Sequence, residues 1–508
     1  MITKVNTGSV AGLDGSRVIV EADFSNGLPS FDVVGLPDTT VREAKERVRS
    51  AIRNSGFDFP AKRGIINLAP ADLKKEGTQF DLPIAIAILV CTGQLKASTD
   101  EFSFVGELGL SGELRGVNGV LSLASCAIES GIKKIFVPLE NAGEASLAGD
   151  IEVYGARSLT DVYRHLLGEC VITPTKTDIN RLFLESCKYS VDFSDVRGQA
   201  ALRRGVEIGV SGGHNILMIG TPGSGKSMIA QRIPTILPDM TLEEAVEVTK
   251  IYSVAGELEG GQHLISSRPF RTPHHSASSP SIVGGGAKAR PGEITLAHNG
   301  VLFLDEFPEY KKDVIEAMRQ PLEDKKITVS RAAASYTYPC NTMLVVALNP
   351  CKCGYYGDGS GRCHCSESDV RRYLGKISGP ILDRIDIQLE ASPVRYSELT
   401  SERGESSAEI KERVNNARRI QKLRYKNDSI TCNAQLGGEL IEKYCAITEE
   451  ESAILKDAFD NMGLTARAYS RILKVARTIA DMEGRDRITT FDIAEAIGYR
   501  SLDRKYFN

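Results

Sequence analysis

The chain has 508 residues, which are too many for a single hydrophobic core and predict two to four domains. Its composition, 42% hydrophobic and 25% charged, is that of an ordinary globular protein. A formal net charge of −4 excludes a globally basic nucleic-acid-binding protein, so contacts with nucleic acid must come from local basic patches.

The apolar segments are too short to predict a membrane protein. The longest uninterrupted apolar stretch is residues 84–91, whereas a membrane span needs about 20 apolar residues. Residues 1–8 lack the apolar core of a signal peptide. We therefore expect a cytoplasmic protein with no membrane partner, and its thiols should be mostly reduced.

The first part of the chain, residues 1–168, is predicted to be one mixed domain. Residues 65–68 and 133–138 are typical of strands, and residues 41–54 have helical periodicity that stops before Gly56. These segments predict an α+β or α/β unit without evident catalytic chemistry. Residues 169–190 are polar and irregular, which predicts a linker.

Residues 191–395 alternate strand-like and helical segments, which predicts a mostly parallel sheet with ligands at the C-terminal ends of its strands. An apolar stretch, residues 215–219, leads into the phosphate-loop pattern G-x-x-x-x-G-K-[ST]. In such a loop the backbone N–H groups surround the phosphates, the lysine reaches the β- and γ-phosphates, and the hydroxyl binds Mg²⁺. The residues are Gly220, Thr221, Pro222, Gly223, Ser224, Gly225, Lys226 and Ser227.

A second nucleotide-binding element follows at a suitable distance. Residues 301–304 are apolar and precede Asp305 and Glu306. Such a strand places the first carboxylate on the metal and the second on an attacking water. The alternative is that both segments are ordinary apolar strands and that the residues after them resemble the motifs by chance. Two matched elements in the expected order favour nucleotide hydrolysis.

A third apolar strand, residues 344–348, ends at Asn349. In a parallel sheet this amide would emerge beside the phosphate loop, where it can orient the attacking water or sense the γ-phosphate. A turn before Pro350 would also explain an asparagine here. The two preceding motifs favour the functional interpretation.

Residues 325–331 alternate charged with apolar or small side chains. This pattern predicts a basic hairpin whose Lys325, Lys326 and Arg331 contact nucleic-acid phosphates. A solvated edge strand would have the same pattern.

Five of the eleven cysteines fall within residues 340–365, which suits a metal site better than a disulfide framework. Two C-x-C pairs within the loop 351–365 can supply four thiolates to a tetrahedral structural zinc. The spacing differs from the usual C-x-x-C, and four unliganded thiols are the alternative. The candidate ligands are Cys351, Cys353, Cys363 and Cys365, with Cys340 and His364 in reserve.

Three arginines could act on a nucleotide. Arg384 lies between two carboxylates in residues 378–386, as either a surface ion pair or an arginine finger for a neighbouring subunit. Arg467 and Arg471 lie four apart in the helical segment 396–508, and either could reach the nucleotide from a lid domain. The residues alone leave these alternatives open.

The order of these parts resembles the ComM/YifB family of magnesium-chelatase-like AAA+ ATPases. The resemblance covers nearly the whole chain and is carried by residues 27–38, 67–72, 271–275, 290–294, 348–351 and 378–386. It implies an α/β AAA+ core with a parallel sheet and a helical lid. An α+β Lon-protease-like domain with a ribosomal-protein-like βαβ arrangement would precede this core.

The resemblance also implies a homo-hexameric ring related to the MCM helicases and metal chelatases. Arg384 matches the trans arginine finger, Arg467 matches the second sensor, and residues 325–331 match the hairpin that enters the ring pore. ComM-type members act as DNA helicases in branch migration during natural transformation. The implied cofactors are ATP and Mg²⁺, and the implied partner is single-stranded or branched DNA.

One departure concerns the Lon-like domain. Gln79 stands where the family of Lon proteases has its serine nucleophile, and Leu123 stands at the position of the lysine base. Neither side chain can perform that chemistry. We therefore expect a domain without proteolytic activity.

The sequence predicts an ATP-driven DNA motor, with a chelatase-type ATPase that remodels a protein partner as the alternative. Lys226 and Ser227 would bind phosphate and Mg²⁺, and Asp305 would organise the metal. Glu306 would be the general base and Asn349 would orient water. An ATP-dependent protease is disfavoured by Gln79 and Leu123.

Overall fold

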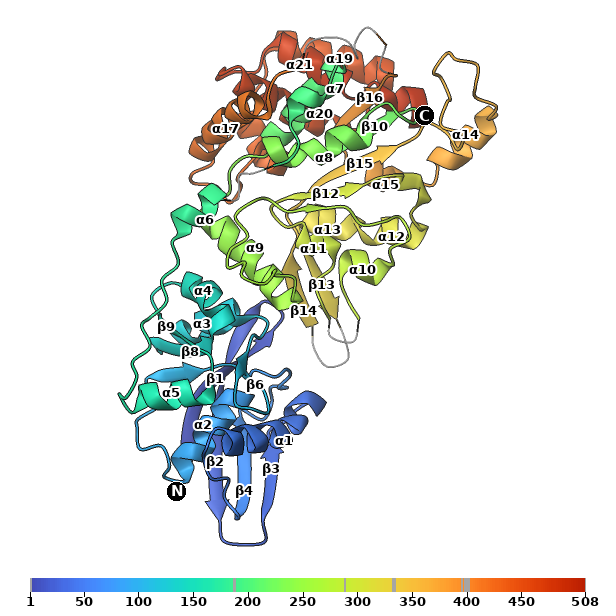
Figure 1. The fold of residues 1–508 in the computed structure, drawn as a ribbon. Coiled ribbons are helices and arrows are strands. Elements are labelled where there is room, and N and C mark those ends of the chain that lie inside the picture. The colour runs from blue at the N-terminus through green and yellow to red at the C-terminus, as the bar shows by residue number, and fades with distance from the viewer. Residues whose placement is uncertain are drawn as a thin grey trace. The chain divides into compact units, whose positions relative to one another are not determined.

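The computed structural model describes residues 2–185, 189–286, 289–330, 335–393, 396 and 403–507. The chain divides into two compact units (Figure 1). The first comprises Met1–Ser186 and Thr241–Ser266, and the second comprises Cys187–Met240 and Ser267–Asn508. Residues 241–266, which the sequence analysis places within the 191–395 core, thus belong to the first unit.

The first unit is built on a mixed seven-stranded sheet in the order β3-β4-β2-β1-β5-β8-β9. β2 pairs antiparallel with β1 and β4, whereas β5, β8 and β9 continue the sheet in parallel from β1. The predicted strand 65–68 lies within β4, and the predicted strand 133–138 is confirmed as β8 except for Lys133. The strands are β1 (Thr3–Ala11), β2 (Asp14–Ser25), β3 (Ser30–Val34), β4 (Arg63–Ala69), β5 (Phe102–Phe104), β8 (Lys134–Pro138) and β9 (Glu152–Ala156), and β6 (Glu107–Leu108) pairs with β7 (Leu114–Arg115).

Several helices of the first unit bury apolar side chains. α1 (Thr39–Asn54) begins at Asp38, whose carboxylate accepts the N–H of Val41, and ends before Gly56, as predicted. α2 (Asp81–Cys91) is buried along most of its length, which explains its uninterrupted apolar sequence. The others are α3 (Val120–Glu129), α4 (Ala142–Ala145), α5 (Leu159–Leu166), α6 (Ile179–Glu185) and α9 (Leu242–Ala255).

α9 belongs to the first unit through buried polar contacts. The hydroxyl of Ser253 donates to Glu144 and accepts the N–H of Gly119, at the start of α3. Glu144 also accepts the N–H of Leu121 at 3.0 Å. Burial raises the pKa of Glu144, although these hydrogen bonds oppose the shift. This carboxyl therefore joins α3, α4 and a segment distant in sequence.

The second unit contains a five-stranded sheet in the order β11-β12-β15-β10-β16. Every neighbouring pair in it is parallel, which confirms the predicted parallel sheet. Its central strands are buried on both faces and are accordingly apolar throughout. The strands are β10 (Ile216–Gly220), β11 (Phe270–Arg271), β12 (Val301–Leu304), β15 (Met343–Leu348) and β16 (Ile387–Ala391).

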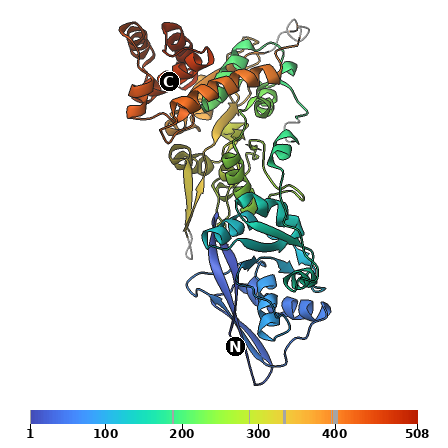
Figure 2. The ribbon, with the colours of Figure 1, turned by 90° about the vertical axis from the view of Figure 1, so that its left-hand side faces the viewer.

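A separate antiparallel hairpin, β13 (Lys326–Ser330) and β14 (Ser335–Pro339), extends away from the five-stranded sheet (Figure 2). It confirms the predicted hairpin in this part of the chain. The helices around the sheet are α7 (Ala200–Gly212), α8 (Lys226–Ile236), α10 (Ser279–Val283), α11 (Glu293–Leu296), α12 (Lys312–Ala317), α13 (Arg319–Asp324), α14 (Glu367–Leu374) and α15 (Gly379–Leu382).

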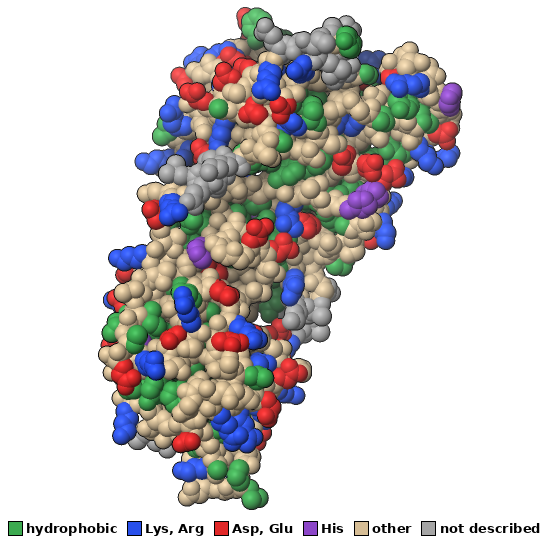
Figure 3. Space-filling view, in the orientation of Figure 1, with side chains coloured by type: hydrophobic (Ala, Val, Ile, Leu, Met, Phe, Trp, Pro, Cys, Tyr) green, Lys and Arg blue, Asp and Glu red, His purple; other side chains and the backbone are tan. Residues whose placement is uncertain are grey.

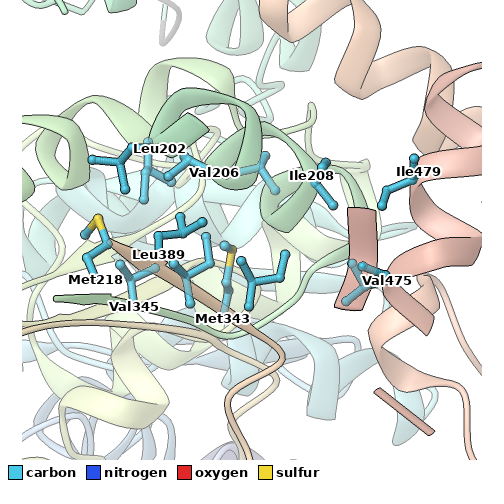
Figure 4. Close-up of a cluster of buried hydrophobic side chains, with 14 of the residues drawn as sticks. Leu202, Val206, Ile208, Met218, Met343, Val345, Leu389, Val475 and Ile479 are labelled. Atoms are coloured by element: carbon cyan, nitrogen blue, oxygen red, sulfur yellow. The ribbon is translucent and has the colours of Figure 1, made fainter. Parts of the chain in front are cut away.

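The C-terminal part of the second unit is helical, as predicted. Its amphipathic helices share one core with the sheet, in which α7 lies between the strands and α20 (Figure 4). Leu202, Val206 and Ile208 of α7 belong to this buried cluster, and so do Val475 and Ile479 of α20. The helices are α17 (Ser407–Arg424), α18 (Glu439–Tyr444), α19 (Glu449–Met462), α20 (Ala466–Met482) and α21 (Thr490–Gly498).

The protein is thus a mixed α/β protein, with a mixed-sheet N-terminal unit and a parallel sheet followed by a helical region. Within the described residues, no helix is both long and apolar enough to cross a membrane. Acidic and basic side chains are interspersed on the face that Figure 3 shows, as the near balance of 62 basic and 66 acidic residues suggests.

Candidate nucleotide-binding site

The loop between β10 and α8 carries the phosphate-loop sequence. β10 is fully buried and leads the chain to the C-terminal edge of the parallel sheet, where α8 begins at Lys226. Gly223 and Gly225 have φ of +78° and +87°, a conformation that other residues rarely adopt. A Cβ on Gly220 would lie 2.3 Å from the backbone oxygen of Ala391. The loop therefore needs these glycines, and it ends at a helix N-terminus that favours an anion.

The ammonium of Lys226 lies inside this loop. Its Nζ donates to the backbone oxygens of Gly220 at 2.7 Å and Thr221 at 2.9 Å. Asn349, which follows the last residue of β15, places its Oδ1 3.3 Å from the same Nζ. Burial lowers the pKa of Lys226 to about 8. A bound phosphate would offset the cost of burying the charged ammonium, so the environment of the lysine suits an anionic ligand.

The two predicted magnesium ligands meet at the same edge of the sheet. Ser227 is the second residue of α8, and Asp305 directly follows β12. The hydroxyl of Ser227 donates to Oδ2 of Asp305 at 2.6 Å. Hydroxyl and carboxylate oxygens are the ligands that Mg²⁺ prefers. These donors fit a magnesium–nucleotide complex, with further magnesium positions left to phosphate oxygens and water.

The predicted general base, Glu306, has an unusual backbone conformation. Its φ is +49°, and its N–H donates to Oδ1 of Asp305 at 2.8 Å. Its side chain is 56% exposed and one carboxylate oxygen lies 3.2 Å from Nδ1 of His275. Residues held in this region of φ cost about 1–3 kcal/mol and gather at functional sites. The conformation turns Glu306 away from the buried strand and leaves its carboxylate accessible to water.

His275 is a site residue whose role the sequence did not reveal. Its ring lies 4.0 Å from that of His274, and the phenol of Tyr310 anchors the segment by donating to the backbone oxygen of Pro273 at 2.5 Å. The only sequence signal was the run 271–275, which carried the family resemblance without a role for either histidine. The structure adds a histidine beside Glu306, the predicted general base.

The arginines predicted to act on the nucleotide contact carboxylates of the second unit. The guanidinium of Arg384 is paired with Glu323 and is only 12% exposed. Arg467 lies 2.8 Å from Asp383 and is 61% exposed. Burial and the nearby charges of other arginines, Arg467 first among them, lower the pKa of Arg384. In the described part of the chain these partners lie outside the phosphate loop.

Arg471, the other candidate arginine on α20, forms an ion pair with a buried carboxylate. It lies 2.8 Å from Asp386, a buried carboxylate that also accepts the N–H of Asn215 at 3.1 Å. Burial alone would raise the pKa of Asp386, but the hydrogen bond from His214 and the charge of Arg471 outweigh it and hold the pKa well below its usual range. Of the two alternatives on this helix, Arg467 is the more accessible.

The three basic residues predicted to bind nucleic acid have different environments. Lys326 is exposed on β13. Lys325 precedes the hairpin with φ of +53°, and its ammonium donates to the backbone oxygen of Thr342 at 3.3 Å. Burial lowers the pKa of Lys325, which argues against the predicted phosphate contact. Arg331 lies outside the described residues.

The four predicted zinc ligands converge. The Sγ atoms of Cys351, Cys353, Cys363 and Cys365 all lie within 4.8 Å of one another. Cys340 is instead buried elsewhere, where its thiol contacts the backbone oxygen of Pro321. Four thiols at this spacing form a plausible zinc site.

Gln79 and Leu123 are buried in the first unit. The amide of Gln79 donates to the backbone oxygen of Glu76 at 2.8 Å. The side chain of Leu123 packs closely against Gly8, where a Cβ would lie 2.9 Å away. Neither side chain is the hydroxyl nucleophile or the amine base that a Lon-type protease needs.

Comparison with protein families gives matches along most of the chain. Residues 192–399 match the family described as magnesium chelatase, subunit ChlI. Residues 20–141 match the family described as subunit ChlI of Mg-chelatase, and residues 404–500 match the magnesium chelatase subunit ChlI C-terminal family.

Several curated proteins are similar over nearly their full length. The competence protein ComM of Haemophilus influenzae is 44% identical over 498 residues, covering 97% of this chain and 96% of that protein. The uncharacterized protein YifB of Escherichia coli is 46% identical over 504 residues, covering 98% and 97%. A shorter match, 28% identical over 99 residues, links the chain to the DNA repair protein RadA of Listeria monocytogenes and covers 20% of this chain and 21% of that protein.

Proposed function

We propose that the chain, which belongs to the magnesium chelatase subunit ChlI family and is similar to ComM and YifB along nearly its whole length, is an AAA+ ATPase that moves DNA. One observation carries the ATPase proposal. The buried ammonium of Lys226, the Ser227–Asp305 pair and Asn349 converge at the C-terminal edge of one parallel sheet.

The proposed roles follow from this geometry. Lys226 neutralises the β- and γ-phosphates, and Ser227 and Asp305 hold Mg²⁺. Mg²⁺ held there would supply positive charge against the charge that develops on the phosphates. Glu306 accepts a proton from the attacking water, which Asn349 helps to orient.

Arg384 is proposed to act on a nucleotide held by a neighbouring subunit, and Arg467 is proposed to reach the nucleotide from the helical lid as the second sensor. The partner of Arg384 lies outside the phosphate loop of its own chain, which supports its action in trans. Arg384 would leave Glu323 when a neighbour's γ-phosphate approaches. This arrangement requires a homo-oligomer, and the family resemblance favours a homo-hexameric ring.

DNA is the proposed partner for two reasons. A relative that is 44% identical is named a competence protein. The hairpin β13–β14 also presents an exposed face with Lys326, Thr328 and Thr337, which suits contact with a phosphate backbone. The proposed activity is translocation on single-stranded or branched DNA, as in helicase-driven branch migration during natural transformation.

The N-terminal region is proposed to be a Lon-like domain that has lost proteolysis. Buried Gln79 and Leu123 support this assignment because neither can serve as nucleophile or base. A structural zinc at the four-cysteine cluster is proposed in addition to ATP and Mg²⁺.

The alternative is a chelatase-type ATPase that remodels a protein partner. The description of the matching families supports it, since they are named for a magnesium chelatase subunit. Both proposals use the same ATP site and differ in what the exposed loops contact.

Steady-state ATP hydrolysis distinguishes the DNA motor from the protein-remodelling ATPase. The purified protein is assayed alone and with single-stranded, duplex and four-way-junction DNA at one low salt concentration, because phosphate contacts weaken with salt. Stimulation by DNA, strongest on the junction, is expected. Hydrolysis that no DNA alters would favour the protein-remodelling alternative, and absence of hydrolysis would overturn both.

A further inference from the structure

The four-cysteine cluster has the dimensions of a tetrahedral thiolate site. Cys351 Sγ lies 3.2 Å from that of Cys353 and 3.8 Å from that of Cys363, and the last two lie 3.6 Å apart. Zinc–sulfur bonds of about 2.3 Å place the thiolates of a tetrahedron about 3.8 Å from one another. A disulfide needs an S–S distance of about 2.05 Å, so the arrangement fits one shared ion.

Rigid elements hold both ends of the cysteine loop. Cys351 is buried just after β15, within the core cluster that lies on one face of the sheet. Cys365 immediately precedes Ser366, which caps α14 by accepting the N–H of Asp369. The ligands therefore come from two anchored ends, which a metal ion would join.

Between the two cysteine pairs the loop turns on several glycines. Gly354, Gly357, Gly359 and Gly361 all have φ between +71° and +88°. Glycine loses more conformational freedom on ordering than any other residue. A metal bound at both ends would therefore stabilise a segment whose sequence favours disorder.

The same loop contacts the proposed ATP site at two points. Asn349, two residues before Cys351, lies 3.3 Å from the ammonium of Lys226. Gly354, one residue after Cys353, lies so close to the phosphate loop that a Cβ there would be 2.6 Å from Cγ and Cδ of Pro222. The first cysteine pair thus lies between two contacts with the phosphate loop.

We propose that one zinc ion bound by Cys351, Cys353, Cys363 and Cys365 clamps residues 349–354 against the phosphate loop, and that zinc occupancy thereby controls the affinity for ATP. The ion joins the sensor Asn349 and the turn at Gly354 into one rigid segment. The proposal of a clamp depends on the proposed ATP site, whereas the proposal of a metal site does not.

Metal content and ATP affinity are measured on the same full-length samples. Elemental analysis should find about one zinc per chain in the protein as purified, and none in the double variant Cys363→Ser/Cys365→Ser. A fluorescent ATP analogue should bind this variant roughly tenfold or more weakly. Cys340→Ser, which removes a buried thiol outside the cluster, should retain both zinc and affinity.

A second variant tests the clamp in a protein that keeps its zinc. Gly354→Ala introduces a methyl group against Pro222, so it should retain zinc and bind the ATP analogue several-fold more weakly. Gly359→Ala is the matched control, because Gly359 also has a positive φ of +71° but no neighbour within 4 Å of an added Cβ. The control should bind both ligands normally.

Each result decides a separate point. Zinc-free protein after expression with added zinc would overturn the metal site. Normal ATP affinity in zinc-free protein or in Gly354→Ala would overturn the clamp. Zinc-loaded wild-type protein that binds no ATP would overturn the proposed ATPase function and the clamp with it, and would leave the metal site standing.

Discussion

At the scale of single residues, the site separates a buried ammonium, that of Lys226, from an exposed carboxylate, that of Glu306. Lys226 is surrounded by backbone oxygens, whereas Glu306 points away from its strand with a positive φ and a 56% exposed side chain. Burial strengthens the attraction of Lys226 for phosphate, and exposure lets Glu306 reach water. The two environments therefore suit binding and proton transfer, respectively.

Changing Glu306→Gln should abolish turnover and preserve ATP binding. The amide keeps the size and position of the side chain but cannot accept the proton of the attacking water, so kcat should fall by roughly 10²–10⁴-fold. The measurement pairs steady-state hydrolysis with the Kd of a fluorescent ATP analogue. Glu309→Gln, an exposed carboxylate three residues away, is the control and should hydrolyse ATP normally. Unchanged turnover in Glu306→Gln would refute the assignment.

The low pKa of Lys226 predicts a pH-dependent affinity for ATP. In the free protein, burial lowers this pKa to about 8. Bound phosphates would raise it, so near and above pH 8 the lysine takes up a proton when ATP binds. Affinity should therefore be constant well below pH 8 and weaken by up to about tenfold per unit as the pH rises above it. Titrations between pH 7 and 9.5 measure this slope. Lys226→Met should bind weakly with no such slope, and an identical slope in that variant would assign the effect to another group.

At the scale of elements, the hairpin β13–β14 shows what a sequence pattern can establish. The alternation in residues 325–331 predicted a hairpin because side chains of a strand face opposite sides in turn. It did not reveal that Lys325 ends α13 with a positive φ and an ammonium directed into the protein. That position depends on the fold around Thr342, which the local pattern does not contain.

Lys326→Ala should reduce DNA stimulation of the ATPase without changing basal hydrolysis. The exposed ammonium is expected to contact a phosphate, so its loss should weaken the apparent affinity for DNA several-fold. The slope of log affinity against log salt concentration should become shallower by about one. The rate of ATP hydrolysis is measured against the concentration of single-stranded DNA at several salt concentrations. Lys456→Ala on α19 also removes an exposed charge and should leave stimulation intact. Equal effects of the two changes would contradict a specific hairpin contact.

Three of the five strands of the parallel sheet, β10, β12 and β15, could be predicted because each is a buried, uninterrupted apolar run that leads into a polar residue. That rule placed Asp305 and Asn349 at one edge with Lys226. The position of His275 beside Glu306 escaped prediction because His275 lies in a short segment after β11, where no periodicity or spacing marks it. The convergence of the four cysteines, in contrast, was predicted from their two C-x-C pairs, and their Sγ atoms lie within 4.8 Å of one another.

At the scale of the whole molecule, one compact unit is built from two segments that are separated in the sequence. Residues 241–266 follow the phosphate-loop helix, yet they pack in the first unit, where Ser253 contacts Glu144 and Gly119. The sequence predicted neither contact, because the pairs are separated by 109 and 134 residues and local patterns carry no such information. A fragment ending before residue 241 would leave the raised-pKa carboxyl of Glu144 without its hydroxyl partner.

Action of Arg384 in trans predicts that two inactive variants restore activity when mixed. Arg384→Ala keeps an intact phosphate loop and general base, whereas Glu306→Gln keeps an intact arginine. In randomly mixed rings, roughly a quarter of the interfaces combine a working base with a neighbour's Arg384. Co-refolded or co-expressed equal mixtures should therefore recover up to about a quarter of wild-type ATP hydrolysis, while each variant alone stays near zero. Arg419→Ala, an exposed arginine on α17, is the control and should be active alone. No recovery in oligomers shown to contain both chains would mean that Arg384 serves its own subunit or only pairs with Glu323.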